Sequence, residues 1–246
     1  MAKKENTANN SHNVKKQTLT DSLSFAGNEA YKQLRTNIIF SLPGDKKSHI
    51  IGITSAEPGE GKSTTAVNLA YSLAQLKKKV LIVEADMRRP FMAQRLDLKA
   101  APGLSELLTG QKEAKEILQR ADAGDVHFYA VTAGALPPNP SELLTNRMMK
   151  RYLNLFGTTF DYIILDLPPV NLVTDAAALS KESEGYVVVA RQDKNSARDL
   201  RKAIDKLKIV DGKVLGFVLN DVKPKRGYGY ESYQKYYHAP ENGENK

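Results

Sequence analysis

Short apolar segments alternate with helical stretches along most of this chain, and this alternation is its strongest structural constraint. Six segments are rich in Ile, Val and Leu, and they lie at 49–54, 80–85, 126–131, 162–167, 185–190 and 214–220. Strands that are apolar throughout are typical of a parallel sheet buried on both faces. Because connections between parallel strands are right-handed, the sequence predicts an α/β fold with a doubly wound, mostly parallel sheet.

Helices are predicted between these segments from apolar spacing and from capping residues. An amphipathic helix is expected at 141–156, with Ser141 as its N-cap. Further helices are expected at 28–42, 62–76, 103–109 and 113–120.

The two ends of the chain lack this pattern. Residues 1–20 are polar, rich in Asn and without periodicity, so a disordered arm is expected there. Residues 223–246 combine Gly, Tyr, Lys and Glu without core-forming periodicity, which predicts a flexible, tyrosine-rich tail. The sequence therefore predicts a single domain at 21–222, a size common for α/β domains.

Composition excludes several classes of protein. The chain has no cysteine, which excludes disulfides, thiolate zinc sites and cysteine nucleophiles. Its four histidines have no metal-ligand spacing, and no apolar run approaches the ~18 residues of a membrane helix. The formal net charge of +8 favours an anionic partner such as a nucleotide, a nucleic acid or an anionic lipid. Part of that excess lies in the arm, so charge alone does not indicate a nucleic-acid-binding protein.

A glycine-rich loop between the first apolar segment and the helix at 62–76 predicts a phosphate-binding site. Glycines let successive backbone N–H groups point at phosphate oxygens, and the helix adds its positive end. Lys62 is expected at the β- and γ-phosphates, and the Ser63 hydroxyl at Mg²⁺. The predicted nucleotide-binding residues are Glu57, Pro58, Gly59, Glu60, Gly61, Lys62, Ser63 and Thr64.

Carboxylates end two of the other apolar segments. Glu84 and Asp86 follow 80–83, and Asp166 ends the segment that begins at 162. In a doubly wound sheet the ligand binds beyond the carboxyl ends of the strands, so these acids are expected to converge on the phosphate loop. There they can hold Mg²⁺ and its waters, or take a proton from an attacking hydroxyl.

These segments together resemble the bacterial tyrosine kinases of the CpsD/CapB family, which act in capsular and exopolysaccharide synthesis. In that family the phosphate loop is Walker A, the acid-x-Asp-x-Arg-Arg-Pro segment at 84–90 is Walker A′, and Asp-x-Pro-Pro at 166–169 is Walker B. The resemblance covers nearly the whole chain. It implies the fold of the deviant P-loop ATPases, with ATP and Mg²⁺ as cofactors.

The resemblance also implies a role for each matched residue. Glu84 stands where the family has an aspartate, so the charge is kept on a longer arm. Asn220 matches an asparagine that contacts the adenine. Glu57 stands where partition and division-site ATPases of this fold carry a lysine, which favours the kinase branch. The implied catalytic residues are Lys62, Glu84, Asp86 and Asp166, and the implied metal ligands are Ser63, Glu84 and Asp166.

Two further segments match the family. Glu29, Lys32 and Arg35 resemble the helix through which family members pack into rings, although an ordinary surface helix would show the same spacing. The tail holds five tyrosines, and the resemblance implies that a neighbouring subunit phosphorylates them. A sticky tail or a stacking surface for single-stranded nucleic acid is the alternative for this cluster. The five are Tyr228, Tyr230, Tyr233, Tyr236 and Tyr237.

The sequence thus predicts a cytoplasmic, Mg²⁺-dependent ATP:protein-tyrosine kinase. The resemblance implies that it phosphorylates its own tail and regulates the synthesis and export of capsular or extracellular polysaccharide. Its implied partners are further copies of itself in a ring, a phosphotyrosine phosphatase, and a membrane-bound activator of the polysaccharide co-polymerase type. That activator's cytoplasmic tail would recruit the kinase to the inner face of the plasma membrane. No nucleic-acid partner is expected. The alternative is a positioning ATPase of the same fold without kinase activity.

Overall fold

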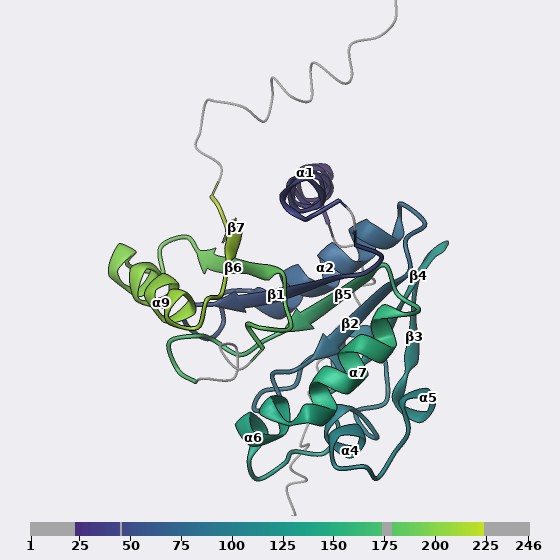
Figure 1. Ribbon diagram of the computed structural model, residues 1–246. Coiled ribbons are helices and arrows are strands. Elements are labelled where there is room, and N and C mark those ends of the chain that lie inside the picture. The colour runs from purple at the N-terminus through teal and green to yellow at the C-terminus, as the bar shows by residue number, and fades with distance from the viewer. Residues whose placement is uncertain (1–22, 45, 174–178, 224–246) are drawn as a thin grey trace, which may run out of the picture.

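The computed structural model describes residues 23–44, 46–173 and 179–223 of the 246-residue chain. The predicted arm at 1–20, and all of the predicted tail except Lys223, lie outside the described residues. The described part forms one sheet with helices on both of its faces (Figure 1).

Seven strands form the sheet, in the order β3-β4-β2-β5-β1-β6-β7. Strand β3 runs antiparallel to β4, and all other neighbouring strands are parallel. This confirms the predicted α/β fold with a doubly wound, mostly parallel sheet. The strands are β1 (His49–Ser55), β2 (Val80–Glu84), β3 (Gln119–Ala123), β4 (Val126–Val131), β5 (Tyr162–Asp166), β6 (Gly185–Arg191) and β7 (Val214–Asn220).

Each face of the sheet carries its own hydrophobic core, because successive strand side chains point to opposite faces. In β2, Leu81 and Val83 belong to one core, whereas Val80 and Ile82 belong to the other. Helices α1 (Phe25–Ser41), α2 (Lys62–Ala74) and α3 (Met92–Leu96) contribute to the core of Val80. The other core takes residues from α4 (Leu104–Leu108), α5 (Ala114–Ile117), α6 (Pro140–Thr145), α7 (Arg147–Gly157) and α9 (Ala197–Ile209).

The predicted helix at 113–120 is wrong in its second half. Helix α5 ends at Ile117, and β3 begins two residues later as an antiparallel edge strand. In β3 the alanines Ala121 and Ala123 are buried while Arg120 and Asp122 are exposed, which is the two-residue period of a half-buried strand. A left-handed glycine, Gly124, turns the chain back into β4.

The predicted single helix at 141–156 is two helices. Asn146 has an extended backbone between α6 and α7, and its side chain accepts a hydrogen bond from the N–H of Met148 at 3.2 Å, which caps α7. The first of the two helices begins earlier than predicted. Its N-cap is Asn139, with Pro140 at the first helical position, so Ser141 is not the cap.

Candidate active site

The glycine-rich loop joins β1 to α2 at the carboxyl edge of the sheet. Gly59 and Gly61 both have positive φ, at 74° and 95°. A Cβ atom at Gly61 would also lie 2.0 Å from the side-chain nitrogen of Asn220, so only glycine fits there. Helix α2 begins at the next residue, Lys62, and presents its N-terminal N–H groups at this edge.

Lys62 lies between two carboxylates. Its Nζ is 2.7 Å from Oδ2 of Asp86 and 3.3 Å from Oδ1 of Asp166, and it also donates to the hydroxyl of Ser63 at 3.2 Å. Burial alone would lower the pKa of Lys62, but the charges of Asp166 and Asp86 together raise it. The lysine is therefore a buried cation whose position is fixed by acids from the ends of two neighbouring strands.

Asp166 is fully buried at the end of β5, directly beside the end of β2. Burial raises its pKa to about 6, against the opposing charge of Lys62. Its Oδ2 atom has no hydrogen-bond partner among the described residues. A buried carboxylate oxygen without a partner, next to a serine hydroxyl and a phosphate loop, fits a Mg²⁺ ion that takes one or two protein oxygens and completes its shell with phosphates and water.

The acids do not form a closed metal cage. Within residues 23–44, 46–173 and 179–223, no group of three or more Asp, Glu, His or Cys is arranged to hold a metal ion. A site with few protein ligands is what Mg²⁺ uses when it binds together with a nucleotide.

Asp86 faces a cavity of about 360 Å³ that adjoins the phosphate loop. Its Oδ1 accepts a hydrogen bond from the N–H of Arg89 at 3.3 Å, which shapes the segment after β2. Polar groups of the loop line one part of the cavity, and apolar side chains line another. The lining residues are Pro58, Gly59, Gly61, Lys62, Ser63, Thr64, Asp86, Arg88, Arg89, Phe91, Pro168, Pro169, Leu172 and Val173.

Glu84 lies at the same edge but is engaged differently. It is almost completely buried, and no contact joins it to Lys62 in the described part of the chain. Its carboxylate accepts hydrogen bonds from three backbone N–H groups, those of Phe91, Met92 and Ala133. Its charge is thus stabilised by the backbone rather than by a cation.

The phosphate loop is held from the other side by residues that the sequence analysis did not select. Lys194 donates to the carbonyl oxygen of Pro58, and Asn195 donates to the carboxylate of Glu60. The same carboxylate accepts from the N–H of Ala56 at 3.0 Å, and burial raises its pKa. The sequence does contain a signal for these residues, the polar run Gln-Asp-Lys-Asn-Ser directly after β6. Ligands of doubly wound sheets bind beyond the carboxyl ends of the strands, so contacts are expected there.

Other predicted binding residues also lie at this edge. Asn220, at the end of β7, donates from its side chain to the carbonyl oxygen of Glu60 at 3.0 Å. Glu57 takes part through its backbone, since its carbonyl oxygen accepts from Ser55 at 2.8 Å. Thr64 lines the cavity.

The predicted interface residues lie on α1, away from the phosphate loop. Lys32 pairs with Glu29 at 2.7 Å on the exposed side of the helix. Arg35 points to α2 of its own chain, where it donates to the carbonyl oxygen of Ser72 at 2.6 Å. Their role in assembly stays a prediction, and the five predicted acceptor tyrosines lie outside the described residues.

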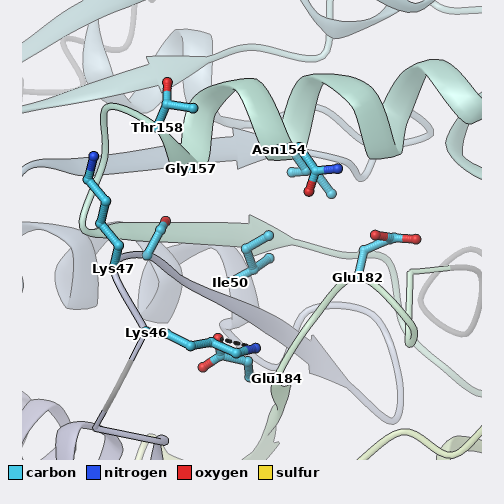
Figure 2. Close-up of a pocket in the computed structure, with 10 residues that line it drawn as sticks. Lys46, Lys47, Ile50, Asn154, Gly157, Thr158, Glu182 and Glu184 are labelled. Carbon is cyan, nitrogen blue, oxygen red and sulfur yellow. Dashed lines mark ion pairs between the residues drawn. The ribbon is translucent and has the colours of Figure 1, made fainter.

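A second cavity of about 390 Å³ lies at the opposite edge, where β1 and β6 begin (Figure 2). Glu184 pairs there with Lys46 at 3.1 Å and with His49 at 2.7 Å. Ligands of doubly wound sheets bind at the carboxyl ends of the strands, so the cavity beside Lys62 is the candidate active site.

Comparisons with known proteins point to one family. The profile of the AAA domain matches residues 48–215. The tyrosine-protein kinase YwqD of Bacillus subtilis (strain 168) is 37% identical over 204 residues, which cover 82% of this chain and 85% of that protein. The chain belongs to the bacterial tyrosine-protein kinases. The enzyme class predicted from the sequence, a protein-tyrosine kinase, is thereby confirmed.

Further members support this assignment. The tyrosine-protein kinase CpsD of Streptococcus agalactiae is 35% identical over 195 residues, covering 79% of this chain and 83% of that protein. The solved kinase domain of the Escherichia coli tyrosine kinase ETK has a TM-score of 0.75 at 32% identity, covering 83% of this chain and 80% of that one. This confirms the resemblance to the CpsD/CapB family.

One more distant structure shares the fold alone. Cobyrinic acid a,c-diamide synthase from Mycobacterium smegmatis, solved with an ATP analogue and magnesium, has a TM-score of 0.56 at 22% identity, covering 70% of this chain and 74% of that one. None of the helices within residues 23–44, 46–173 and 179–223 has the length and apolar character of a membrane span.

Proposed function

We propose that this kinase transfers the γ-phosphoryl group of ATP, with Mg²⁺, to tyrosines of its own tail in a neighbouring copy. The acceptors are Tyr228, Tyr230, Tyr233, Tyr236 and Tyr237. The observation that carries the proposal is Lys62, a buried cation held by Asp86 and Asp166 beside a cavity that joins the phosphate loop to an apolar wall. A phosphate group and an aromatic ring would each find a matching surface there.

The chemistry follows from the positions of these side chains. When bound, Mg²⁺ supplies positive charge to the phosphates, and Ser63 and Asp166 are the residues that would hold it. Lys62 neutralises charge on the transferred group. A new bond forms between the tyrosine oxygen and the γ-phosphorus, and the bond to the bridging oxygen of ADP breaks.

The proton of the tyrosine hydroxyl goes to a carboxylate, and Asp86 is better placed for this than Asp166. Asp86 lines the cavity, whereas Asp166 is fully buried, is not among the lining residues, and has its Oδ1 toward Lys62. Glu84 accepts from three backbone N–H groups and is not among the residues that line the cavity.

The wider role follows from the family. We propose that the kinase works in the cytoplasm and is recruited to the inner face of the plasma membrane by a membrane-bound activator of the polysaccharide co-polymerase type. Further copies of the chain would assemble through Glu29, Lys32 and Arg35, and a phosphotyrosine phosphatase would reverse the reaction. The phosphorylation state would regulate capsular or extracellular polysaccharide synthesis and export.

The fate of the γ-phosphate tests the proposal. Purified protein is incubated with γ-labelled ATP and Mg²⁺, and label on tyrosine is compared with label released as inorganic phosphate. We expect label on tyrosine, with little inorganic phosphate. Release of inorganic phosphate without phosphotyrosine would instead indicate a positioning ATPase and overturn the proposal.

A further inference from the structure

Glu84 connects two backbone segments that follow neighbouring strands. Its Oε1 accepts from the N–H groups of Phe91 and, at 2.7 Å, Met92, where α3 begins. Its Oε2 accepts from the N–H of Ala133 at 3.0 Å, just beyond the end of β4. Strand β2, which Glu84 ends, pairs with β4. One buried carboxylate therefore ties the segment after β2 to the segment after β4.

These contacts occupy the carboxylate. An ionised carboxylate offers about four acceptor positions, and three of them are taken here by N–H groups in a buried setting. One acceptor position remains, and Glu84 is not among the residues that line the cavity beside Lys62. A cation that took a second position would break a hydrogen bond and leave a buried N–H group without a partner, which is costly. Glu84 is consequently a poor ligand for Mg²⁺ in this arrangement.

The segment that Glu84 holds carries part of the active site. Residues 86–91 run from Asp86, which contacts Lys62, to Phe91, which lines the cavity. Asp86 fixes the near end of this segment through Arg89, and Glu84 fixes the far end through Phe91 and Met92. With both ends held, the wall of the cavity has a defined shape.

We infer that Glu84 is a positioning residue for this wall and not a metal ligand. Only its expected effect on phosphotransfer rests on the proposed function. The length of the side chain matters. An aspartate would withdraw the carboxylate by about 1.5 Å, one C–C bond, so it could not reach both segments. A glutamine could accept from one segment, but its amide nitrogen would face an N–H group of the other.

Glu106 offers a matched control. Its carboxylate accepts from the N–H of Gly103 at 2.7 Å and from the N–H of Ala135 at 3.0 Å. It thus holds the segment after β4 only two residues from Ala133, but it makes no contact with residues 86–92. Glu106→Gln therefore removes similar backbone contacts without touching the wall of the active site.

The first measurement is amide hydrogen exchange in full-length wild type, Glu84→Gln, Glu84→Asp and Glu106→Gln. Each Glu84 variant can keep its contact with only one of the two segments. We therefore expect amide exchange in the other segment, at Phe91 and Met92 or at Ala133, to rise by about tenfold or more. In Glu106→Gln the exchange at Phe91 and Met92 should stay at the wild-type rate. Unchanged exchange at all three amides in both Glu84 variants would overturn the inference.

The second measurement separates positioning from metal binding. Binding of a fluorescent ATP analogue is titrated with Mg²⁺, and the half-saturating Mg²⁺ concentration is compared among the variants. It should stay within about twofold of wild type for Glu84→Gln, whereas Asp166→Asn should raise it about tenfold or more. A rise in Glu84→Gln comparable to that of Asp166→Asn would show that Glu84 is a ligand.

The third measurement concerns the reaction. For a tail-derived acceptor peptide, Glu84→Gln should lower kcat by about tenfold or more at saturating ATP and Mg²⁺, because a shifted wall misplaces the acceptor, while Glu106→Gln should stay near wild type. An equal loss in both variants would contradict a specific role. The exchange and Mg²⁺ measurements need no phosphotransfer, so they decide the role of Glu84 even if the proposed kinase reaction fails its own test.

Discussion

At the scale of single residues, Lys62 is the group on which the site depends. It is the cation that two buried carboxylates share, and the proposed reaction uses its charge at the transferred phosphoryl group. Lys62→Met should lower phosphotransfer by about 10²-fold or more, the usual effect of removing a preorganised charge. The measurement is autophosphorylation at saturating ATP, at a temperature where circular dichroism shows the variant folded. Near-wild-type activity would mean that the phosphate-loop assignment is wrong.

Asp166 makes the stability of the nucleotide-free protein depend on pH. Its pKa rises from 3.8 to about 6 on folding, so between these values the folded state binds the proton more tightly than the unfolded state. The stability that this group contributes is present below pH 3.8 and is lost as pH rises through about 6, a loss of up to about 3 kcal/mol.

Asp166→Asn removes this titration. The difference in free energy of unfolding, variant minus wild type, should therefore be larger at about pH 7.5 than at about pH 4, by up to about 3 kcal/mol. Urea denaturation of both proteins at the two pH values measures the difference. If that difference is independent of pH, the carboxyl does not titrate near pH 6 in the folded state.

Sequence alone could predict that Lys62, Asp86 and Asp166 meet, because the carboxyl ends of parallel strands lie at one edge of the sheet. It could not predict that Glu84 turns to the backbone. Its partners are the backbone N–H groups of Phe91, Met92 and Ala133. Because nearly every residue type has a backbone N–H group, the residue pattern does not predict which of them bind a carboxylate.

At the scale of elements, α1 is attached to the domain by a polar contact as well as by apolar packing. Arg35 donates to the carbonyl oxygen of Ser72 on α2, and Ile38 is buried in the core on that face. Arg35→Ala should lower the free energy of unfolding by about 1–2 kcal/mol, because a partly buried charged hydrogen bond is lost.

The control for this prediction is Lys32→Ala on the same helix. Its ion pair with Glu29 is exposed, so its loss should cost less than about 0.5 kcal/mol. Urea denaturation of both variants gives the comparison. Equal effects would mean that the contact with Ser72 does not hold α1 in place.

The elements that were wrongly predicted show where local pattern fails. The five residues of β3 were too few and too polar to be separated from the preceding helix, and they form a strand because β4 offers an edge to pair with. The break between α6 and α7 depends on one extended residue, Asn146, within a continuous helical pattern. The buried strands were predicted well, because uniform burial produces a uniform apolar run.

At the scale of the whole molecule, the proposal predicts transfer between chains. The tail follows β7, whose last residue, Asn220, contacts the phosphate loop at Glu60, so transfer within one chain and transfer between chains are told apart by mixing two variants. We therefore mix a Lys62→Met chain, which keeps its tyrosines, with an active chain whose five tail tyrosines are phenylalanine. Label should accumulate on the Lys62→Met chain. A mixed reaction that leaves that chain unlabelled would contradict transfer between copies.

Phosphorylation should also change assembly. Each phosphate adds about −1.5 to −2 charge, so five of them add about −7.5 to −10, which offsets the net charge of +8 and would place like charges beside Asp86 and Asp166. Phosphorylated tails should therefore leave the neighbouring active sites, and the oligomer should dissociate into smaller species. Light scattering of phosphorylated and unphosphorylated protein at equal concentration measures this. The same mass for both samples would remove the link between phosphorylation and assembly.

The most direct test of the central claim is to locate the phosphate. Wild type, Lys62→Met and the variant with five phenylalanines are each incubated with ATP and Mg²⁺, and phosphotyrosine is mapped residue by residue by mass spectrometry. The account predicts phosphotyrosine between Tyr228 and Tyr237 in wild type, none in Lys62→Met, and almost none in the five-phenylalanine variant despite its intact site. Phosphotyrosine at undiminished levels in Lys62→Met, or its absence from the tail of wild type, would contradict it.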